Sequence, residues 1–145
     1  MYVKQLSEDV KLDYVMLDYI QLIKDCVMGE NANAAVTRVS RVLKNTAKQL
    51  QIPIIAASQL NRELEKRPNK RPIMSDLRDS GSLEQDADVI WFLYRDEIYN
   101  PLDTDSPGIT EIKMAKNRQL GSAPAQQLRW DKKTRRLYAV TYAAV

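Results

Sequence analysis

The chain has 145 residues, of which 44% are hydrophobic and 28% are charged, and its formal net charge is +3. This composition is typical of one soluble globular domain and excludes a disordered or fibrous chain. A single cysteine, Cys26, and no histidine exclude a disulfide framework, metal clusters of these residues and histidine-dependent catalysis. No apolar run reaches the roughly 20 residues of a membrane span, and the charged start MYVKQLSEDVK differs from a signal peptide. We therefore expect a cytoplasmic protein with no membrane partner.

The first part of the chain predicts two helices and two buried strands. Residues 2–11 have helical spacing, and the apolar run 14–20 that follows predicts a strand buried on both faces. Residues 33–50 repeat apolar side chains every three or four positions, which indicates an amphipathic helix. A second apolar run, 53–59, opens on proline, which is tolerated at the first position of a strand.

The second part predicts a long polar loop and then further strands. Residues 61–82 contain two prolines and no sustained period, which is typical of a functional or mobile loop. A third apolar run, 88–95, predicts another buried strand. Segments that alternate more strongly follow at 109–117, 125–130 and 135–142, the last two joined as a hairpin by DKKT. We expect residues 1–145 to form one α/β unit with a parallel core and an antiparallel C-terminal extension.

Polar side chains follow the first two core strands. Asp18 with Gln21 ends the first strand, and Ser58 with Gln59 ends the second. In an open parallel sheet, ligands bind beyond the carboxyl ends of the strands. A carboxylate there suits Mg²⁺ bound with nucleotide phosphates, and a glutamine can sense a phosphate or position a water. The alternative from spacing alone is an aspartate that caps the next turn and a glutamine that hydrogen-bonds a loop.

Two other segments carry candidate phosphate contacts. In MSDLRDSGSLEQDADVI, Gly81 permits a tight turn and Arg78 can reach a phosphate, although a plain solvated loop fits equally. Lys116 and Arg118 stand two residues apart at the end of a strand, so both cations share one face. Such a pair can stabilise a transferring phosphate or serve solubility alone.

Two basic segments can meet a nucleic-acid backbone or simply form solvated surface. Glu63 and Glu65 interrupt the first segment. Because charge runs are most often solvated faces, neither segment enters the functional prediction. Their cations are Arg62, Lys66, Arg67, Lys70 and Arg71 in the first, and Lys132, Lys133, Arg135 and Arg136 in the second.

The order of these motifs resembles one protein family. The C-terminal RecA-like motor of DnaB-type replicative helicases is similar over about residues 3–130, through YVMLDYIQL, IPIIAASQLNRELEKR, RPIMSDLRDSGSLEQDADVIWFLYRDEIYNP and EIKMAKNRQ. The run SDLRDSGSLEQDADVI is the most specific of these motifs. The resemblance implies an α/β fold with a RecA-like parallel sheet at its core.

The resemblance also implies a nucleotide site. Asp18 matches the Walker B carboxylate that holds the Mg²⁺ of Mg-ATP. Gln59 matches the glutamine that sits near the γ-phosphate and couples it to DNA-contacting loops. The implied cofactors are therefore ATP and Mg²⁺.

The remaining matches concern the ring and the DNA. Arg78, Asp79 and Gly81 match the loop that lines the central channel and contacts single-stranded DNA. Lys116 and Arg118 match the cationic pair, including the arginine finger, that reaches the ATP of the neighbouring subunit. The implied partners are single-stranded DNA and the other subunits of a homo-hexamer.

Two departures from the family pattern bear on activity. After Arg118 the family continues Asn-Gly-Pro, whereas this chain has Gln119–Gly121. The chain also has no G-x-x-x-x-G-K-[ST] phosphate loop, and the catalytic glutamate of the family belongs to a strand upstream of this sequence. We predict an incomplete RecA-like core without the phosphate-loop strand, which the family has between segments 52–58 and 88–94.

Three arrangements can complete such a core: the two flanking strands pair directly, another polypeptide fills the gap, or edges pair between copies. The leading prediction is part of a replicative DNA helicase that couples ATP hydrolysis to translocation on single-stranded DNA and duplex unwinding. We expect the isolated chain to be inactive and to need an N-terminal helicase half. The alternative is a non-catalytic module that binds single-stranded DNA or the ring interface of a full-length helicase. Another RecA-fold ATPase, such as a recombinase-like protein, shares Asp18 and Gln59 but not the SDLRDSGS loop.

Overall fold

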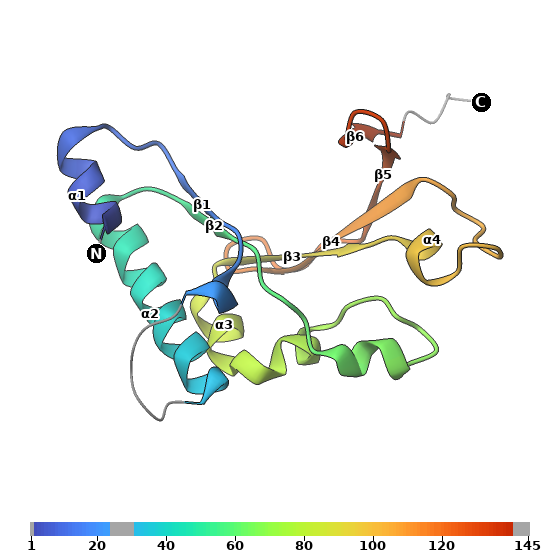
Figure 1. Ribbon diagram of the computed structural model, residues 1–145, viewed down its shortest axis with the longest axis horizontal. Helices are drawn as coiled ribbons and strands as arrows, with labels where there is room; N and C mark the ends of the chain where they lie inside the picture. The colour runs from blue at the N-terminus through green and yellow to red at the C-terminus, as the bar shows by residue number, and fades with distance from the viewer. Residues whose placement is uncertain (1, 24–30, 141–145) are drawn as a thin grey trace. The chain divides into compact units, whose positions relative to one another are not determined.

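A computed structural model describes residues 2–23 and 31–140 of the chain (Figure 1). Cys26 and positions 141–142, the end of the last predicted strand, lie outside these residues. The chain divides into two compact units, and each is described by itself. Unit 1 comprises Met1–Asn61 and Ser75–Ala87, and unit 2 comprises Arg62–Met74 and Asp88–Val145. That the whole of 1–145 forms one unit stays a prediction.

The elements follow the predicted order, with additional short helices. Those that lie mainly in unit 1 are α1 (Tyr2–Asp9), β1 (Val15–Leu17), the 3₁₀ helix η1 (Ile20–Leu22), α2 (Ala32–Leu50), β2 (Ile54–Ala56), the 3₁₀ helix η3 (Met74–Ser80) and α3 (Gly81–Asp86). Those of unit 2 are the 3₁₀ helix η2 (Arg62–Lys66), β3 (Val89–Tyr94), α4 (Asp96–Tyr99), β4 (Ile109–Asn117), β5 (Gln126–Asp131) and β6 (Arg136–Ala139). In the described ranges, no helix combines the length and the hydropathy that crossing a membrane requires.

The helix α2 is the amphipathic helix that the apolar periodicity predicts. Asn31 caps its first turn, where Oδ1 accepts a hydrogen bond from the N–H of Ala34 at 2.8 Å. Gln51 follows the last turn in the left-handed conformation, with φ of 57°. The buried core of unit 1 contains Ile20, Val36, Val39 and Leu83. One face of α2 therefore supplies half of this core.

The strands β1 and β2 form a two-stranded parallel sheet alongside α2 (Figure 1). Leu17 and Ala56, which are register partners, pack against the core on one face of this sheet. Met16 and Ile55 are register partners on the opposite face, and they are 70% and 47% exposed. The expectation of a strand buried on both faces is therefore wrong for this chain. An apolar run reports which side chains avoid water in the finished assembly, and here one face is still open.

Unit 2 contains a four-stranded antiparallel sheet in the order β3-β4-β5-β6. Phe92 and Tyr94 of β3 are 5% and 7% exposed, whereas the alternating Trp91 and Leu93 are 59% and 62% exposed. The antiparallel C-terminal strands are confirmed. The run 88–95 was expected to join the parallel core, but the strand beside β3 is the antiparallel β4. Both β2 and β3 are edge strands of separate sheets, so direct pairing between them does not occur in the described chain.

The segment predicted as a long loop, 61–82, contains short helical turns. These are η2, η3 and the start of α3, which are too brief to produce a periodic pattern. Leu64 in η2 and Leu77 in η3 are buried. Within unit 1, the N–H of Asn61 donates to the carbonyl of Asp76 at 2.9 Å. The segment is thus fixed by local contacts rather than by a regular repeat.

Arg71 fastens residues 62–74 to the sheet of unit 2. Its guanidinium donates two hydrogen bonds to the carboxylate of Glu111 on β4, at 2.8 and 2.7 Å. The same guanidinium lies 4.6 Å from the ring centroid of Tyr94. Tyr94 in turn stacks on Tyr99 at 5.7 Å and donates a hydrogen bond to Asp96 at 2.6 Å. Burial, together with that hydrogen bond, raises the pKa of Tyr94 to about 12.

Candidate functional site

The two parallel strands bring Asp18 and Gln59 to one edge of their sheet. Asp18 follows β1 directly, and Gln59 lies three residues after β2. Parallel pairing directs both carboxyl ends the same way. Asp18 is exposed, so its carboxylate is solvated at the strand tip rather than buried among apolar groups. The peptide bond between Asp18 and Tyr19 is cis.

The side chain of Gln21 joins the two strand ends. Its Nε2 donates to Ser58 Oγ at 3.1 Å and to the carbonyl of Gln59 at 3.3 Å. Its Oε1 accepts from the N–H of Gln59 at 3.2 Å. Gln21 therefore fixes the backbone of Gln59 while the Gln59 residue itself stays exposed. The spacing put these four polar residues at one edge, but it gave Gln21 no such role.

The second candidate segment runs through η3 into α3. Arg78 and Asp79 belong to η3, and Gly81 begins α3. The side chains of Arg78 and Asp79 lie outside the described part of the chain, so their predicted contacts stay predictions. Gly81 is exposed, and a side chain at this position would meet no atom within 4 Å. Packing within the chain therefore does not require glycine there, and the backbone is open to a ligand.

The helix α3 that follows is tied to α2. Ser82 Oγ donates to Thr37 Oγ1 at 3.1 Å, and Ser40 Oγ donates to Asp86 Oδ2 at 2.7 Å. Ser40 is buried, as is Leu83 between the two ties. A fixed helix thus follows the candidate loop.

Lys116 and Arg118 lie at the end of β4. Lys116 is the register partner of Ile90, and the N–H of Arg118 donates to the carbonyl of Asp88 at 2.8 Å, which extends the pairing beyond the strand. Arg118 Nη1 lies 3.2 Å from Asp88 Oδ1, in an ion pair whose side chains are 53% and 58% exposed. Such an exposed pair contributes only about 0–1 kcal/mol. Arg118 can therefore exchange this carboxylate for a phosphate with little loss of stability.

A tight turn follows this cationic pair. Asn117 Oδ1 accepts hydrogen bonds from the N–H groups of Gln119 and Leu120, at 2.9 and 3.1 Å. The N–H of Gly121 donates to the carbonyl of Asn117 at 2.8 Å, with φ of 78° at Gly121. A residue other than glycine would be strained there. The departure at 119–121 from the family pattern thus still gives a closed turn directly after Arg118.

The structure also has a pocket that the sequence did not predict, wholly within unit 2. Its volume is about 360 Å³, and the Arg95 guanidinium lies 5.2 Å from the ring centroid of Trp130. Two buried polar atoms of its lining, Arg95 Nε and Thr110 Oγ1, have no hydrogen-bond partner. The lining residues are Leu93, Tyr94, Arg95, Ile98, Tyr99, Thr110, Trp130 and Leu137. An arginine directly after a buried strand was the only signal, and its partner Trp130 lies on a different strand.

Comparison with known proteins identifies the family. The family model for the "DnaB-like helicase C terminal domain" matches residues 1–139. Similar curated proteins include the replicative DNA helicases DnaB of Buchnera aphidicola subsp. Acyrthosiphon pisum, 54% identical over 111 residues, and of Haemophilus influenzae, 49% identical over 111 residues. Each alignment covers 77% of this chain and 24% of the relative. The chain thus spans about a quarter of the length of these relatives.

Solved structures agree with this match. A solved helicase-like ATPase domain superposes with a TM-score of 0.87 at 37% identity, covering 97% of this chain and 49% of that one. "The Structure Of A DnaB-Like Replicative Helicase And Its Interactions With Primase" gives the same TM-score and identity and covers 97% of this chain and 34% of that one. The predicted RecA-like α/β fold is confirmed. The chain belongs to the family of DnaB-like helicase C-terminal domains.

Proposed function

We propose that this chain is part of the motor of a replicative DNA helicase, which couples ATP hydrolysis to translocation on single-stranded DNA and to duplex unwinding. The observation that carries the proposal is the parallel pairing of β1 and β2, by which Asp18 and Gln59 share one sheet edge. Family membership and the helicase relatives support the reaction. No observation favours the rival reading, a non-catalytic module that modulates another helicase.

ATP and Mg²⁺ are the cofactors of this proposal. The described residues contain no group of three or more side chains suited to a metal ion. That donor set fits Mg²⁺ bound with a nucleotide, because such a site uses one or two carboxylates, with phosphates and waters as the other ligands. Asp18, exposed at the strand end, is the residue that would hold the ion. When bound, Mg²⁺ would neutralise charge that develops on the phosphates.

Other residues of the chain act on the phosphates in this proposal. Gln59 sits where a γ-phosphate or its attacking water can be sensed, and Gln21 holds its backbone so that a shift of the strand end is passed on. Lys116 and Arg118 project from the end of β4 toward the ATP of a neighbouring subunit in a homo-hexamer. Arg118 would leave Asp88 for a phosphate oxygen.

The pocket of unit 2 supports a seat for a nucleobase. Arg95 and Trp130 offer planar surfaces against which a base can stack, and Trp130 lies on β5. The unpaired Arg95 Nε is a donor and the unpaired Thr110 Oγ1 can donate or accept, which suits the nitrogen edge of a purine. We assign this pocket to the base of ATP.

Single-stranded DNA is the proposed track of the motor. Arg78 and the backbone N–H groups near Gly81 would contact its phosphates, with Asp79 in the same loop. The absence of packing around Gly81 supports this, since a strand backbone can approach the open main chain closely.

An N-terminal helicase half is the proposed second component. The chain covers about half of the solved ATPase domain, and the face of Met16 and Ile55 on the β1–β2 sheet is open. Apolar strand faces of this kind are normally covered in α/β proteins. A segment that carries the phosphate loop would cover this face and complete the ATPase core.

Reconstitution tests the proposal. The chain is mixed with an N-terminal fragment of a DnaB-family helicase that carries the phosphate loop, and ATP hydrolysis is measured with and without single-stranded DNA. We expect turnover only in the mixture, abolished by Asp18→Asn and kept by Asp13→Asn, a matched change at an exposed aspartate off the strand end. Turnover that survives Asp18→Asn would contradict the proposal. Inhibition of an intact helicase without recovery in the mixture would favour the modulating module.

A further inference from the structure

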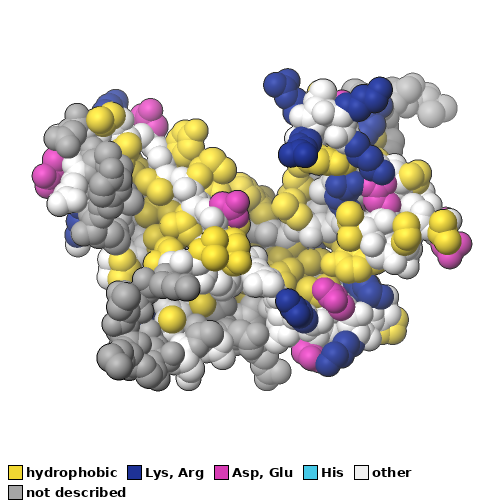
Figure 2. All heavy atoms as spheres, in the orientation of Figure 1, with side chains coloured by type: hydrophobic (Ala, Val, Ile, Leu, Met, Phe, Trp, Pro, Cys, Tyr) yellow, Lys and Arg dark blue, Asp and Glu magenta, His cyan; other side chains and the backbone are white. Residues whose placement is uncertain are grey.

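The positive charge of this chain is concentrated in one hairpin. Residues 129–136 contain five cations and one carboxylate, a net formal charge of +4, whereas the whole chain has +3. The rest of the chain therefore has a net charge of −1. Figure 2 shows the lysine and arginine side chains gathered over β5 and β6. The cations are Arg129, Lys132, Lys133, Arg135 and Arg136, and all five are exposed.

The hairpin has two different faces. On one face, Trp130 pairs with Leu137, and both line the pocket of unit 2. On the other face, Arg129 pairs with Tyr138, and Arg136 follows at the next position of the same face. Tyr138 is 40% exposed. This second face, named here the cationic face, thus carries arginines around an exposed aromatic ring.

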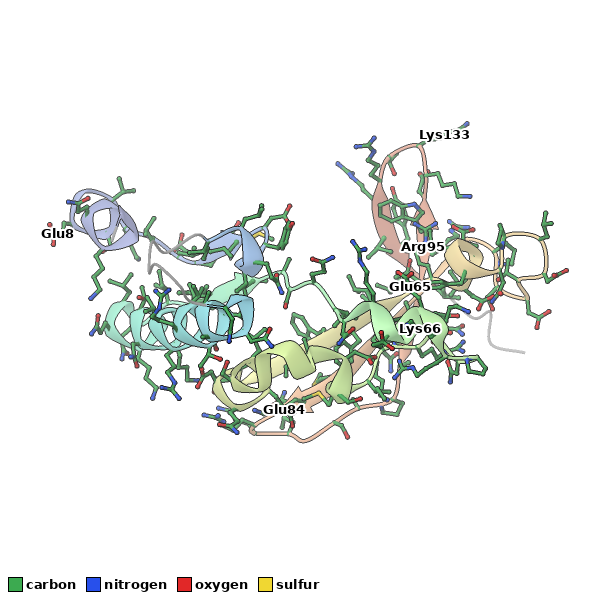
Figure 3. The ribbon with its side chains drawn as sticks, turned by 60° about the horizontal axis from the view of Figure 1, so that its bottom comes forward. Glu8, Glu65, Lys66, Glu84, Arg95 and Lys133 are labelled. Carbon is green, nitrogen blue, oxygen red and sulfur yellow. The ribbon has the colours of Figure 1, made fainter. Side chains whose placement is uncertain are left out.

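The turn of the hairpin adds cations and withholds its one carboxylate. Asp131 Oδ1 accepts from the N–H of Lys133 at 2.8 Å, and Oδ2 accepts from Thr134 Oγ1 at 2.9 Å. The hydrogen bond from Thr134 holds the pKa of Asp131 below its usual value. Arg135 occupies the left-handed region, with φ of 54°, where hairpin turns favour glycine or asparagine. The turn thus presents an exposed arginine at a position that local conformation disfavours, and Figure 3 shows the neighbouring Lys133 at the hairpin tip, away from Arg95.

We propose that the cationic face and turn of the β5–β6 hairpin bind single-stranded DNA, as a contact separate from the loop around Arg78. The cations would meet phosphate oxygens, and Tyr138 would stack on a base. The aromatic ring favours a single strand, because bases in a duplex are already stacked on one another. This inference rests on the proposed function, since DNA is the polyanion on which that motor acts.

Two charge-matched variants test the inference. The hairpin variant carries Lys132→Gln, Lys133→Gln, Arg135→Asn and Arg136→Gln, with asparagine chosen because it tolerates the left-handed region. The control variant removes the same charge from exposed positions of unit 1, through Lys4→Gln, Lys11→Gln, Arg41→Gln and Lys48→Gln. Binding of a fluorescent oligothymidylate is followed by anisotropy across about 50 to 200 mM salt, and circular dichroism checks that each variant is folded.

The hairpin variant should bind more weakly than the control and with a shallower salt dependence. Each phosphate contact to a single strand contributes about 0.7 to the slope of log affinity against log salt, so four lost contacts lower the slope by about 3. Equal losses in the hairpin and control variants would overturn the proposal, because they would reflect net charge alone. Undiminished binding by the hairpin variant would overturn it as well.

Tyr138 separates single-stranded DNA from other polyanions. Tyr138→Ala should weaken oligothymidylate binding several-fold, and Tyr138→Phe should keep it, because the ring and not the hydroxyl stacks. Equal affinity of the hairpin for a duplex or for polyglutamate would overturn the assignment to a single strand. Arg78→Gln is measured alongside. Full binding by Arg78→Gln counts against the channel loop of the proposed function, whereas full binding by the hairpin variant counts against this inference alone.

Discussion

The two sheets of this chain differ in how much of their own surface they satisfy. The β1–β2 sheet has three register pairs and covers one face only, with Met16 and Ile55 open on the other. The four-stranded sheet of unit 2 is paired along its length and buries Phe92 and Tyr94 within unit 2. Antiparallel strands complete their pairing with local hairpins, whereas parallel strands need distant segments on both sides. The difference indicates that unit 2 stabilises itself and that the parallel sheet depends on more polypeptide.

This difference also separates the candidate functions. The proposed catalytic edge, with Asp18 and Gln59, lies on the incomplete parallel sheet. The cationic pair of β4, the pocket and the basic hairpin lie on the self-sufficient antiparallel sheet. Binding functions of unit 2 can therefore be measured on this chain by itself, whereas catalysis awaits its second component.

The largest expected effect breaks the antiparallel sheet from within. Phe92→Ala should lower the free energy of unfolding by about 3–5 kcal/mol, because it removes a buried ring and leaves a cavity. Trp91→Ala, one position earlier on the exposed face, should lower it by less than about 1 kcal/mol. Urea denaturation followed by circular dichroism measures both. Equal losses would mean that both faces of β3 are buried in solution.

A second pair of substitutions tests the open face of the parallel sheet. Met16→Gln with Ile55→Thr should change the stability of the chain alone by less than about 0.5 kcal/mol. Binding of the N-terminal half should weaken by about 2–3 kcal/mol, roughly 30- to 150-fold in Kd, if that half buries the exposed part of both side chains. Isothermal titration calorimetry measures the affinity, with Met16→Leu and Ile55→Val as the control. Unchanged affinity would show that this face is not the docking surface.

A third test uses the pKa of Tyr94 in the self-sufficient unit. Its folded pKa of about 12 lies above the ordinary value of 10.0, so the folded state keeps the phenol proton where the unfolded chain loses it. The resulting stabilisation is fully present below pH 10 and is lost as the pH rises to about 12, on the order of 1–2 kcal/mol.

The measurement for Tyr94 compares wild type with Tyr94→Phe. Asp96, Arg71 and Glu111 face the phenol, and they remain in both proteins. Stability measured by denaturation should fall more steeply between pH 10 and 12 in the wild type than in Tyr94→Phe. Parallel curves would mean that Tyr94 is accessible to solvent and unshifted.

The smallest expected effect concerns the tie between residues 62–74 and β4. A double-mutant cycle with Arg71→Gln and Glu111→Gln should give a coupling of about 0.5–1 kcal/mol, because the pair is bidentate but Arg71 is 49% exposed. The Lys66–Glu63 pair, 74% and 66% exposed, provides the control cycle and should give about 0.3 kcal/mol or less. Equal couplings would remove the special role of Arg71.

Local pattern was enough to predict most elements. The strand 109–117 and the hairpin turn after Asp131 are where the alternation predicts them, because an antiparallel strand next to its turn is defined by neighbouring residues. The short helices within 61–82 were not predicted, since five to seven residues give no period. The length of β1 was overestimated, because Ile20 belongs to a 3₁₀ turn that uses the same apolar side chain.

The amino-acid sequence by itself determined the order of elements, the family and the two polar strand ends at Asp18 and Gln59, since each depends on residues adjacent in the chain. Only the tertiary structure decided which face of the β1–β2 sheet is open and which partners hold the sites. Gln21 meets Ser58 across 37 positions, and Arg71 meets Glu111 across 40. Such contacts depend on how distant segments pack, and no local pattern encodes that distance. For the same reason the pocket beside Arg95 became visible only in the folded chain.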